Sequence, residues 1–230
     1  LIDYYTYVLC GDGDLMEGVT YEAISLAGTL KLNKLIVLYD SNDICLDGKT
    51  NKTFNENIAM RFVSMGWNVI TVDDGESYEA ISKAIDAAKL STDKPTLIEI
   101  KTVIGKYSSV QGTAKAHGSP LSQEDITNIK EKLGVRDIPF TVTQTPIEDM
   151  AYLIEERNKN ISEEFDKLVE TLDDETKKEL NYLMGEDKTI SLKDLEYTPP
   201  EASEEAPRVT SGKILNGISE FVPYILFILF

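Results

Sequence analysis

The sequence has 230 residues, 42% hydrophobic and 27% charged, which is enough for one sizeable core and a smaller appendage. Its net charge of −17 argues against non-specific nucleic-acid binding, because a polyanion favours clustered Lys and Arg. The two cysteines, Cys10 and Cys45, do not make a disulfide framework and favour packing roles in a reduced, cytoplasmic compartment. The apolar residues 222–230 are too few to span a membrane, which needs about 20 residues, and are typical of a buried strand.

In chain order, predicted strands alternate with predicted helices. Aromatic and β-branched residues over 4–10 predict a strand that runs into a GDGD turn. Apolar residues at helical spacing predict a helix over 17–31. The same reasoning predicts strands at 34–40, 67–72 and 96–101 and an amphipathic helix at 77–90. This alternation indicates an α/β fold: a doubly wound, mostly parallel sheet with helices on both faces.

The composition and the predicted structure of the sequence change near residue 135. Before that point, Ser122 and Asp125 form the aspartate variant of a capping box, which predicts a helix that ends at Gly134. After it, acidic amphipathic helices are predicted at 148–160 and 162–183, and 196–207 has the composition of a linker. We therefore expect three regions: an α/β domain over 1–135, an acidic helical linker region over 136–204, and the truncated start of a second α/β domain over 205–230.

The segments that follow the strands carry the candidate chemistry, because ligands of parallel α/β sheets bind beyond the carboxyl ends of the strands. Asp12 lies between Gly11 and Gly13, where the backbone can turn sharply and approach a ligand. A carboxylate there would repel a phosphate unless a divalent cation lies between them. Mg²⁺ takes about six oxygen ligands, and Asn42, 30 residues later, can supply an amide oxygen.

Two other motifs are excluded at the GDGD turn. A calcium-binding loop is excluded because Met16 occupies the fifth position and Glu17 the position of the obligatory glycine. A dinucleotide-binding fingerprint is excluded because the third glycine is missing at its required spacing.

The segment GDGDLMEGVTYEAISLAGTLKLNKLIVLYDSNDICLDG resembles the thiamine diphosphate motif of the transketolase family, in which GDG is followed about thirty residues later by Asn. The resemblance implies that Asp12 and Asn42 are side-chain ligands of Mg²⁺ and that Ile44 gives the same ion a backbone carbonyl. It also implies that Gly13 contacts the diphosphate. Glu17 falls on an acidic position that the family places near the subunit interface.

Two later segments extend the resemblance. The segment KPTLIEIKTVIGKYSSVQGTAKAHGSPL is similar to the one that ends this domain in the family, and it contains the single histidine, His117. The resemblance implies that His117 is catalytic and reaches both diphosphate and sugar substrate, while Ile104 packs on the cofactor. In RVTSGKILNGISEF, Arg208 matches an arginine of the pyrimidine-binding domain that holds the sugar phosphate. The alternative for Arg208, a solvated arginine at the end of a linker, stays open.

By resemblance, the intact protein is a homodimeric, cytoplasmic transferase of the pentose phosphate pathway that moves two-carbon ketol units between sugar phosphates. The sequence lacks the family's upstream segment and most of the pyrimidine-binding domain, so we expect an excerpt that is inactive alone. The alternatives are a non-catalytic truncated or split-gene module, which binds cofactor or a complementary chain, and a fragment of dihydroxyacetone synthase or deoxyxylulose-phosphate synthase. No nucleic-acid or membrane partner is expected.

Overall fold

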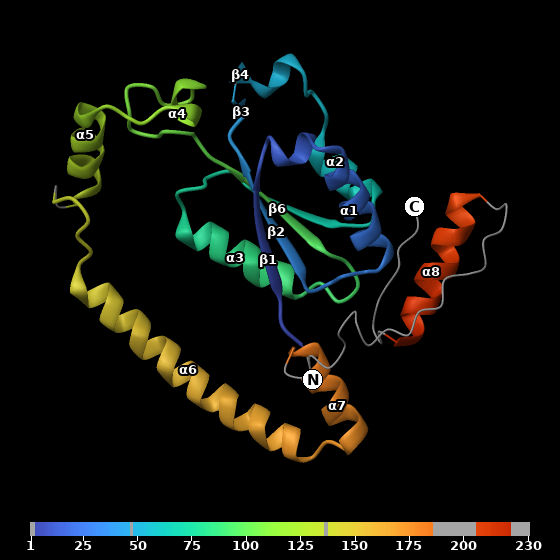
Figure 1. Ribbon diagram of the computed structural model, residues 1–230. Helices are drawn as coiled ribbons and strands as arrows, with labels where there is room; N and C mark the ends of the chain where they lie inside the picture. The colour runs from blue at the N-terminus through green and yellow to red at the C-terminus, as the bar shows by residue number, and fades with distance from the viewer. Residues whose placement is uncertain (1–2, 47, 136–137, 186–205, 222–230) are drawn as a thin grey trace. The chain divides into compact units, whose positions relative to one another are not determined.

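The computed structural model describes residues 3–46, 48–135, 138–185 and 206–221, and the chain divides into two units, Leu1–Phe140 and Thr141–Phe230. The described part of the first unit contains a four-stranded parallel sheet in the order β1-β2-β6-β5 (Figure 1). Its strands are β1 (Thr6–Gly11), β2 (Leu35–Ser41), β6 (Thr96–Lys101) and β5 (Asn68–Val72). All four lie at the sequence positions where strands are expected.

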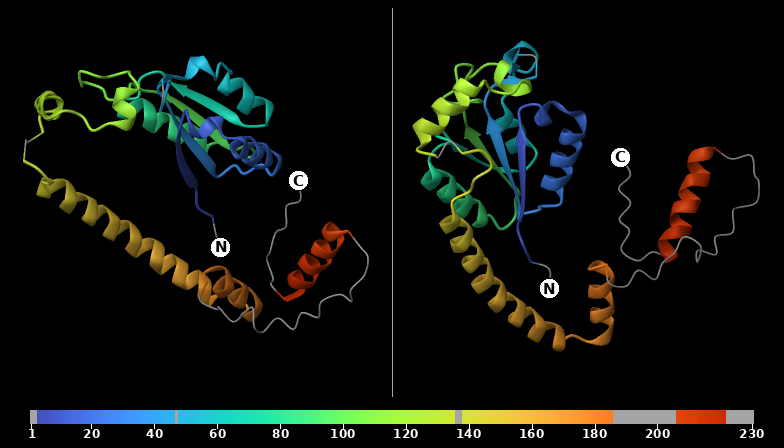
Figure 2. Two further views of the ribbon diagram at one scale, coloured as in Figure 1. Left: turned by 45° about the horizontal axis from the view of Figure 1, so that its top comes forward. Right: turned by 60° about the vertical axis from the view of Figure 1, so that its left-hand side comes forward.

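Helices cover both faces of this sheet. Helices α1 (Gly18–Thr29) and α2 (Ile58–Ser64) pack on one face, and α3 (Tyr78–Lys89) packs on the other (Figure 2). The expected α/β fold, with a mostly parallel sheet between helical layers, is therefore confirmed. The short helix α2 had no counterpart among the predicted elements, since seven residues give little helical periodicity.

The sheet separates two hydrophobic cores because alternate residues of each strand point to opposite faces. On the α1 and α2 face, the rings of Phe62 and Trp67 meet edge to face with centroids 5.0 Å apart. The indole Nε1 of Trp67 donates a 2.7 Å hydrogen bond to the carbonyl of Ile24, which ties α1 to the start of β5. On the α3 face, Ala84 and Ala88 let the helix approach the buried residues of β2 and β6 closely.

Short elements gather after the carboxyl ends of the strands. They are the 3₁₀ turns η1 (Asp14–Met16) and η2 (Thr50–Lys52), the two-stranded hairpin β3 (Ile44–Cys45) and β4 (Gly48–Lys49), and helices α4 (Lys115–Gly118) and α5 (Gln123–Leu133). Helix α5 begins as predicted, with the Ser122 hydroxyl accepting the backbone N–H of Asp125 at 3.0 Å. It ends at Gly134, whose φ of 66° is left-handed, a conformation that favours glycine.

The described residues of the second unit form α6 (Gln144–Glu170), α7 (Asp174–Leu183) and α8 (Pro207–Phe221). The predicted helices at 148–160 and 162–183 have wrong boundaries, because no Gly or Pro interrupts the chain near 161. The break falls at Asp173, whose carboxylate caps α7 by accepting the N–H of Thr176 at 2.9 Å.

Two other predictions concern the end of the chain. Most of the segment predicted as a linker, 196–207, and the strand predicted at 222–230 lie outside the described residues. No helix in the described ranges is both long and apolar enough to cross a membrane.

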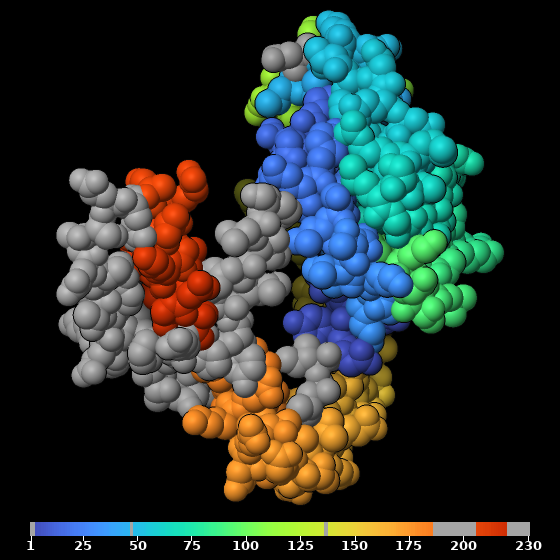
Figure 3. Space-filling model, turned by 90° about the vertical axis from the view of Figure 1, so that its right-hand side faces the viewer, coloured from blue at the N-terminus to red at the C-terminus, as the bar shows by residue number. Residues whose placement is uncertain are grey.

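Close packing of α1 against the end of α2 leads to a test of the first unit. Figure 3 shows the segments that carry these two helices side by side on one face. A Cβ added at Gly28 would lie 1.8 Å from the carbonyl oxygen of Met65, which is too close for two non-bonded atoms. The backbone at Gly28 or at Met65 would therefore have to move. We expect Gly28→Ala to lower the free energy of unfolding by about 1–3 kcal/mol.

The matched control is Gly18→Ala in the same helix, where an added Cβ meets nothing within 4 Å. Because alanine favours helix over glycine, this variant is expected to be neutral or up to about 1 kcal/mol more stable. Urea unfolding followed by circular dichroism measures both. Equal stability of the two variants would contradict the packing described for α1.

Candidate functional site

The parallel register brings three loops to one edge of the sheet. Gly11 of β1 lies opposite Asp40 of β2, and Ser41 of β2 lies opposite Lys101 of β6. The loops that follow β1, β2 and β6 therefore begin at the same level. These are the loops that contain the predicted metal, cofactor and substrate residues of the first unit.

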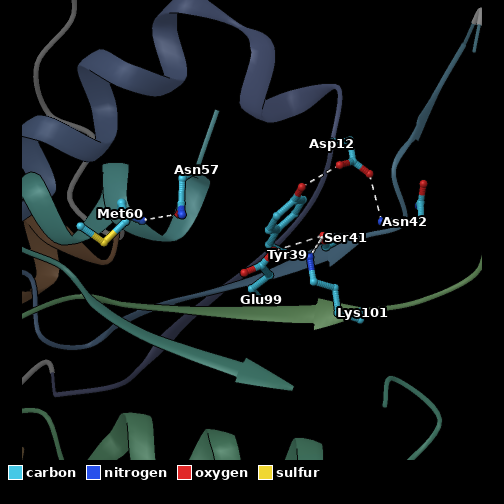
Figure 4. Close-up of polar contacts among 8 residues, drawn as sticks. All are labelled: Asp12, Tyr39, Ser41, Asn42, Asn57, Met60, Glu99 and Lys101. Atoms are coloured by element: carbon cyan, nitrogen blue, oxygen red, sulfur yellow. Dashed lines mark hydrogen bonds and ion pairs between the residues drawn. The ribbon is translucent and has the colours of Figure 1, made fainter. Parts of the chain in front are cut away.

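Asp12 is, with Ile44, the most enclosed of the predicted site residues, and each has 4% of its surface exposed. Its Oδ1 accepts a 2.6 Å hydrogen bond from the hydroxyl of Tyr39, and its Oδ2 accepts the backbone N–H of Asn42 at 3.1 Å (Figure 4). Burial of a carboxylate requires such donors, because desolvation of the charge is costly. The predicted pair Asp12 and Asn42 is thus in direct contact.

The glycine turn shapes the space in front of Asp12. The carboxylate of Asp14 folds back to accept the N–H of Gly11 at 2.8 Å, which closes the turn. Gly13 has an ordinary helical φ of −62°, and a Cβ there would meet nothing within 4 Å. Neither the backbone conformation nor packing among the described residues requires glycine at this position, and the open space fits close approach of a ligand.

The loop after β2 continues the site from Asn42 to Ile44. The side-chain Oδ1 of Asn42 accepts the backbone N–H of Ile44 at 3.0 Å, which fixes the orientation of the amide. Between them, Asp43 has a φ of 62°, a left-handed conformation that is uncommon outside glycine. The carbonyl of Asp43 accepts the N–H of Thr50 at 3.0 Å, so the β3–β4 hairpin supports this turn.

A cavity of about 470 Å³ opens on the Asp12 side of the sheet edge, and Tyr39, Ser41, Glu99 and Lys101 contribute to its wall. The ammonium of Lys101 donates to Ser41 Oγ at 2.9 Å and to Glu99 Oε1 at 2.6 Å (Figure 4). A second cavity of about 410 Å³ is lined by Asn42 and Ile44 together with the start of the loop after β6. Asp43 and Thr50 line both, so the turn after β2 separates them.

Burial changes the acid–base behaviour of two groups around Asp12. Desolvation, with help from the neighbouring carboxylates of Asp14, Asp12 and Asp40, raises the pKa of the Cys10 thiol to about 12. Cys10 therefore stays protonated near neutral pH, as expected for a packing role rather than a nucleophile. Desolvation and the hydrogen bond to Asp12 also raise the pKa of Tyr39, so its hydroxyl keeps its proton and acts as a donor.

His117 and Ile104 lie on the loop after β6. His117 belongs to α4, its side chain is exposed, and no hydrogen bond among the described residues joins that side chain to Asp12 or Asn42. Ile104 is half-buried, and its carbonyl accepts the N–H of Gly112 at 2.8 Å. Gly112 lines the smaller cavity beside Asn42, which brings this loop next to the predicted metal residues.

Contacts with distant elements hold the loop after β6. The hydroxyl of Tyr107, a residue with a left-handed φ of 68°, donates to both carboxylate oxygens of Glu76 at 3.0 Å, and Lys106 pairs with the same carboxylate. Hydrogen bonding to Lys106 lowers the pKa of Glu76. On the other side, Asp125 accepts the backbone N–H of Ser109 at 2.6 Å.

The remaining predicted residues lie at the start of α1 and in α8. Glu17 is exposed at the N-terminus of α1, where its backbone, not its side chain, caps the helix. Arg208 is exposed in α8 of the second unit. The structure therefore brings together Asp12, Asn42 and Ile44, and it leaves Arg208 in a separate unit.

Tyr39 is the site residue that sequence reasoning missed. A signal was present, because the strand LIVLYDS faces a hydrophobic core and a buried tyrosine hydroxyl needs a partner. Among the residues described, no group of three or more His, Cys, Asp or Glu side chains is arranged so that it could hold a metal ion by itself. The candidate site instead combines one carboxylate, one amide and backbone groups, which suits a cation that takes its other ligands from phosphate and water.

A glycine turn and a buried carboxylate at the carboxyl edge of a parallel sheet define the class of α/β cofactor-binding domains. Comparison with known families identifies the member of this class. The model of the family described as "Transketolase, thiamine diphosphate binding domain" matches residues 1–187. The chain belongs to this family.

Individual relatives agree with the family match. The chain is 38% identical to the transketolase of Bacillus subtilis, in a match that covers 97% of this chain and 34% of that protein. It is 53% identical to the transketolase of Geobacillus stearothermophilus, in a match that covers 57% of this chain and 20% of that protein. Among solved structures, Campylobacter jejuni transketolase superposes with a TM-score of 0.78 at 36% identity over 96% of this chain and 34% of that one. Leishmania mexicana transketolase superposes with a TM-score of 0.69 at 44% identity, over 73% of this chain and 25% of that one. The chain thus spans about a third or less of these relatives.

The hydrogen bonds from Ser109 to Asp125 form a tether between the loop after β6 and α5, and this tether leads to a prediction about pH. Hydrogen bonds from Ser109 and then from Ser122 lower the pKa of Asp125 below its ordinary value of 3.8. Because folding favours the ionised form, the tether contributes its full stability above that value and loses it as pH falls through the lower folded pKa. We expect Asp125→Asn to be less stable than the unaltered chain at neutral pH, and the difference to shrink in acid.

Urea unfolding between about pH 7 and pH 2.5 measures this difference. Glu124→Gln removes the same charge from the same first turn of α5 and is the matched control. Its effect is expected to be smaller, because Glu124 is exposed and helix-dipole interactions at the surface are weak. A constant difference between Asp125→Asn and the unaltered chain over the whole pH range would refute the tether.

Proposed function

We propose that this chain supplies the part of a transketolase that anchors the diphosphate end of thiamine diphosphate through Mg²⁺. The observation that carries the proposal is the direct contact between the buried Asp12 carboxylate and the Asn42 turn. The two groups come from loops after adjacent parallel strands, at the edge where ligands of such sheets bind. Family membership supports the cofactor, since the matching family is described by its binding of thiamine diphosphate.

The residues at this edge fit a magnesium ion. Asp12 offers a carboxylate, Asn42 an amide oxygen and Ile44 a backbone carbonyl, and all three are oxygen ligands of the kind that Mg²⁺ prefers. Each oxygen of Asp12 and Asn42 that accepts a hydrogen bond keeps a second lone pair for a cation. The open space at Gly13 admits the diphosphate, whose charge the ion would offset.

Other residues take roles around this anchor. His117 reaches the diphosphate and the sugar substrate and acts in catalysis, since an imidazole can donate to phosphate oxygens. Ile104 packs on the cofactor, and Arg208 holds the sugar phosphate in the intact protein. Bound thiamine diphosphate supplies the carbon–carbon chemistry for moving a two-carbon ketol unit between sugar phosphates. These residues bind, orient and donate protons.

The intact protein is proposed to be a cytoplasmic homodimer of the pentose phosphate pathway, with Glu17 near the subunit interface. The exposure of Glu17 at the N-terminus of α1 supports a place at the interface, because an interface residue is accessible in the isolated chain. The second candidate function is a non-catalytic module that binds the cofactor or a complementary chain with the pyrimidine-binding domain. The matching family model describes a thiamine diphosphate binding domain alone, and this supports cofactor binding by such a module.

A charge-matched pair of variants tests the anchor. Asp12→Asn removes the carboxylate proposed to bind Mg²⁺, and we expect it to weaken Mg²⁺ binding in the presence of thiamine diphosphate by about tenfold or more. Asp14→Asn removes the same charge two residues away, where the side chain is exposed and accepts the N–H of Gly11. Its effect is expected to stay below about threefold, because exposed charges contribute little.

Isothermal titration of MgCl₂ into each chain with saturating thiamine diphosphate measures this difference. Circular dichroism spectra check that both variants are folded. Equal losses in the two variants would mean that local charge, and not ligation by Asp12, governs binding, and the anchor would have to be abandoned.

Activity assays separate the two candidate functions. With Mg²⁺, thiamine diphosphate, a ketose phosphate donor and an aldose phosphate acceptor, we expect no ketol transfer from this chain alone. The chain in this assay spans about a third or less of the transketolases that it matches, so the other regions of those relatives are not supplied. Turnover is expected when a second polypeptide that carries the unmatched regions of a transketolase is added, and Asp12→Asn should abolish it. Ketol transfer by the chain alone would contradict this, and binding without any complementation would favour the non-catalytic module.

A further inference from the structure

Tyr107 joins the loop after β6 to the start of α3 and to the end of α5. Its hydroxyl donates to both carboxylate oxygens of Glu76, which precedes α3, at 3.0 Å. The ammonium of Lys132, in the last turn of α5, lies 4.7 Å from the centroid of its ring, a distance typical of a cation–π contact. Lys106, the neighbour of Tyr107 in the loop, pairs with the same Glu76 carboxylate. We call these four residues the Tyr107 clamp.

The backbone at Tyr107 fits glycine better than tyrosine. Its φ of 68° is left-handed, a conformation in which the Cβ of an L-residue is crowded. Glycine would relieve this crowding, but it would supply none of the side-chain contacts of the clamp. Residues in such conformations are held by their surroundings, and they gather at functional sites. The crowded backbone therefore points to a role for the side-chain contacts.

The clamp holds a closed segment of the chain that carries both predicted residues of the loop. The 2.8 Å backbone hydrogen bond accepted by the Ile104 carbonyl closes this segment. A Cβ added to Gly105 would lie 2.6 Å from the Cβ of Ala116, so α4 packs directly on the start of the loop. His117 is the next residue of α4. A movement of Tyr107 would therefore move Ile104 and His117 as well.

We propose that Tyr107 is a positioning residue, whose clamp holds Ile104 and His117 in their binding positions before the cofactor arrives. This inference rests on the proposed function, because it takes from there the contacts of these two residues with the cofactor. A loop that is ordered in advance loses less conformational freedom when a ligand binds, so its affinity is higher. Release of the clamp should therefore weaken cofactor binding without removing a group that touches the cofactor.

Tyr107→Gly releases the clamp and relieves the crowded backbone in one change. Thiamine diphosphate is titrated by calorimetry into the full chain with saturating MgCl₂, and urea unfolding measures stability. We expect the dissociation constant to rise by about 3- to 10-fold, because the ligand must now order the loop. The urea midpoint is expected to stay near that of the unaltered chain, because relief of the crowding offsets contacts that lie near the surface. Weaker binding at unchanged stability is the readout, since a merely structural residue would lower both.

Phe140→Gly is the matched control. Phe140 also has a left-handed backbone, with a φ of 56°, but its ring is fully exposed and lies outside the loop after β6. Its replacement is expected to leave the dissociation constant unchanged. Glu76→Ala removes the acceptor of the Tyr107 hydroxyl and leaves the sequence of the loop intact. It is expected to weaken binding in the same direction as Tyr107→Gly.

Hydrogen–deuterium exchange of residues 104–117 measures the order of the loop directly. In the absence of cofactor, exchange is expected to be about 3- to 10-fold faster in Tyr107→Gly than in the unaltered chain. With saturating thiamine diphosphate and MgCl₂ the two rates are expected to converge, because the bound ligand then orders the loop in both chains. Equal exchange in the two free chains would mean that the clamp does not order the loop, and it would overturn the positioning role.

The outcomes separate this inference from the proposed function. If the unaltered chain does not bind thiamine diphosphate, the proposed function fails, and this inference fails with it. If the unaltered chain binds and Tyr107→Gly binds as tightly, or loses stability in proportion to affinity, the positioning role is overturned while the anchor stands. Where Tyr107→Gly does not fold, Glu76→Ala decides: weaker binding at unchanged stability supports the clamp, and unchanged binding overturns it.

Discussion

One buried carboxylate joins the two loops on which the rest of the site depends. Asp12 is almost fully enclosed, and no ion pair among the described residues includes it. Two neutral donors, the Tyr39 hydroxyl and the Asn42 N–H, hold the charge in the folded chain. Because neutral donors compensate a buried charge only partly, a cation at this position would improve the electrostatics of the fold and of the ligand together.

The parallel sheet makes this contact possible from residues 30 apart in the sequence. Register aligns the ends of β1 and β2, so the first residue after each strand starts from the same level. The same register places β6 next to β2, and the hydroxyl of Thr102 at its end hydrogen-bonds the Asp40 carboxylate at the end of β2. A polar contact thus links the end of β1 to the end of β2, and another links the end of β2 to the end of β6. A shift of one residue in either register would turn these side chains to the opposite face of the sheet.

Much of the first unit could be predicted from sequence because its signals are local. Four strands, α1, α3 and the start of α5 depend on periodicity and on capping residues such as Ser122. The length of α6 was predicted wrongly, although the sequence near 161 contains no Gly or Pro that would end a helix there. The β3–β4 hairpin was also missed, because two-residue strands have no periodicity to detect.

The candidate site has two halves, one that contains Asp12 and Asn42 and one that contains His117. They differ in how far the sequence predicts their positions. Asp12 and Asn42 each follow a strand that sequence predicts in a parallel sheet, whereas the position of His117 depends on contacts that carry no local signal. Tyr107 adopts a left-handed backbone that glycine would adopt more easily, and Glu76 and Asp125 hold its loop from two other elements. Strain of this kind persists only where surrounding contacts compensate for it. The half of the candidate site that contains Asp12 and Asn42 is therefore built into the sheet, while the half that contains His117 depends on side-chain contacts between distant segments of the chain.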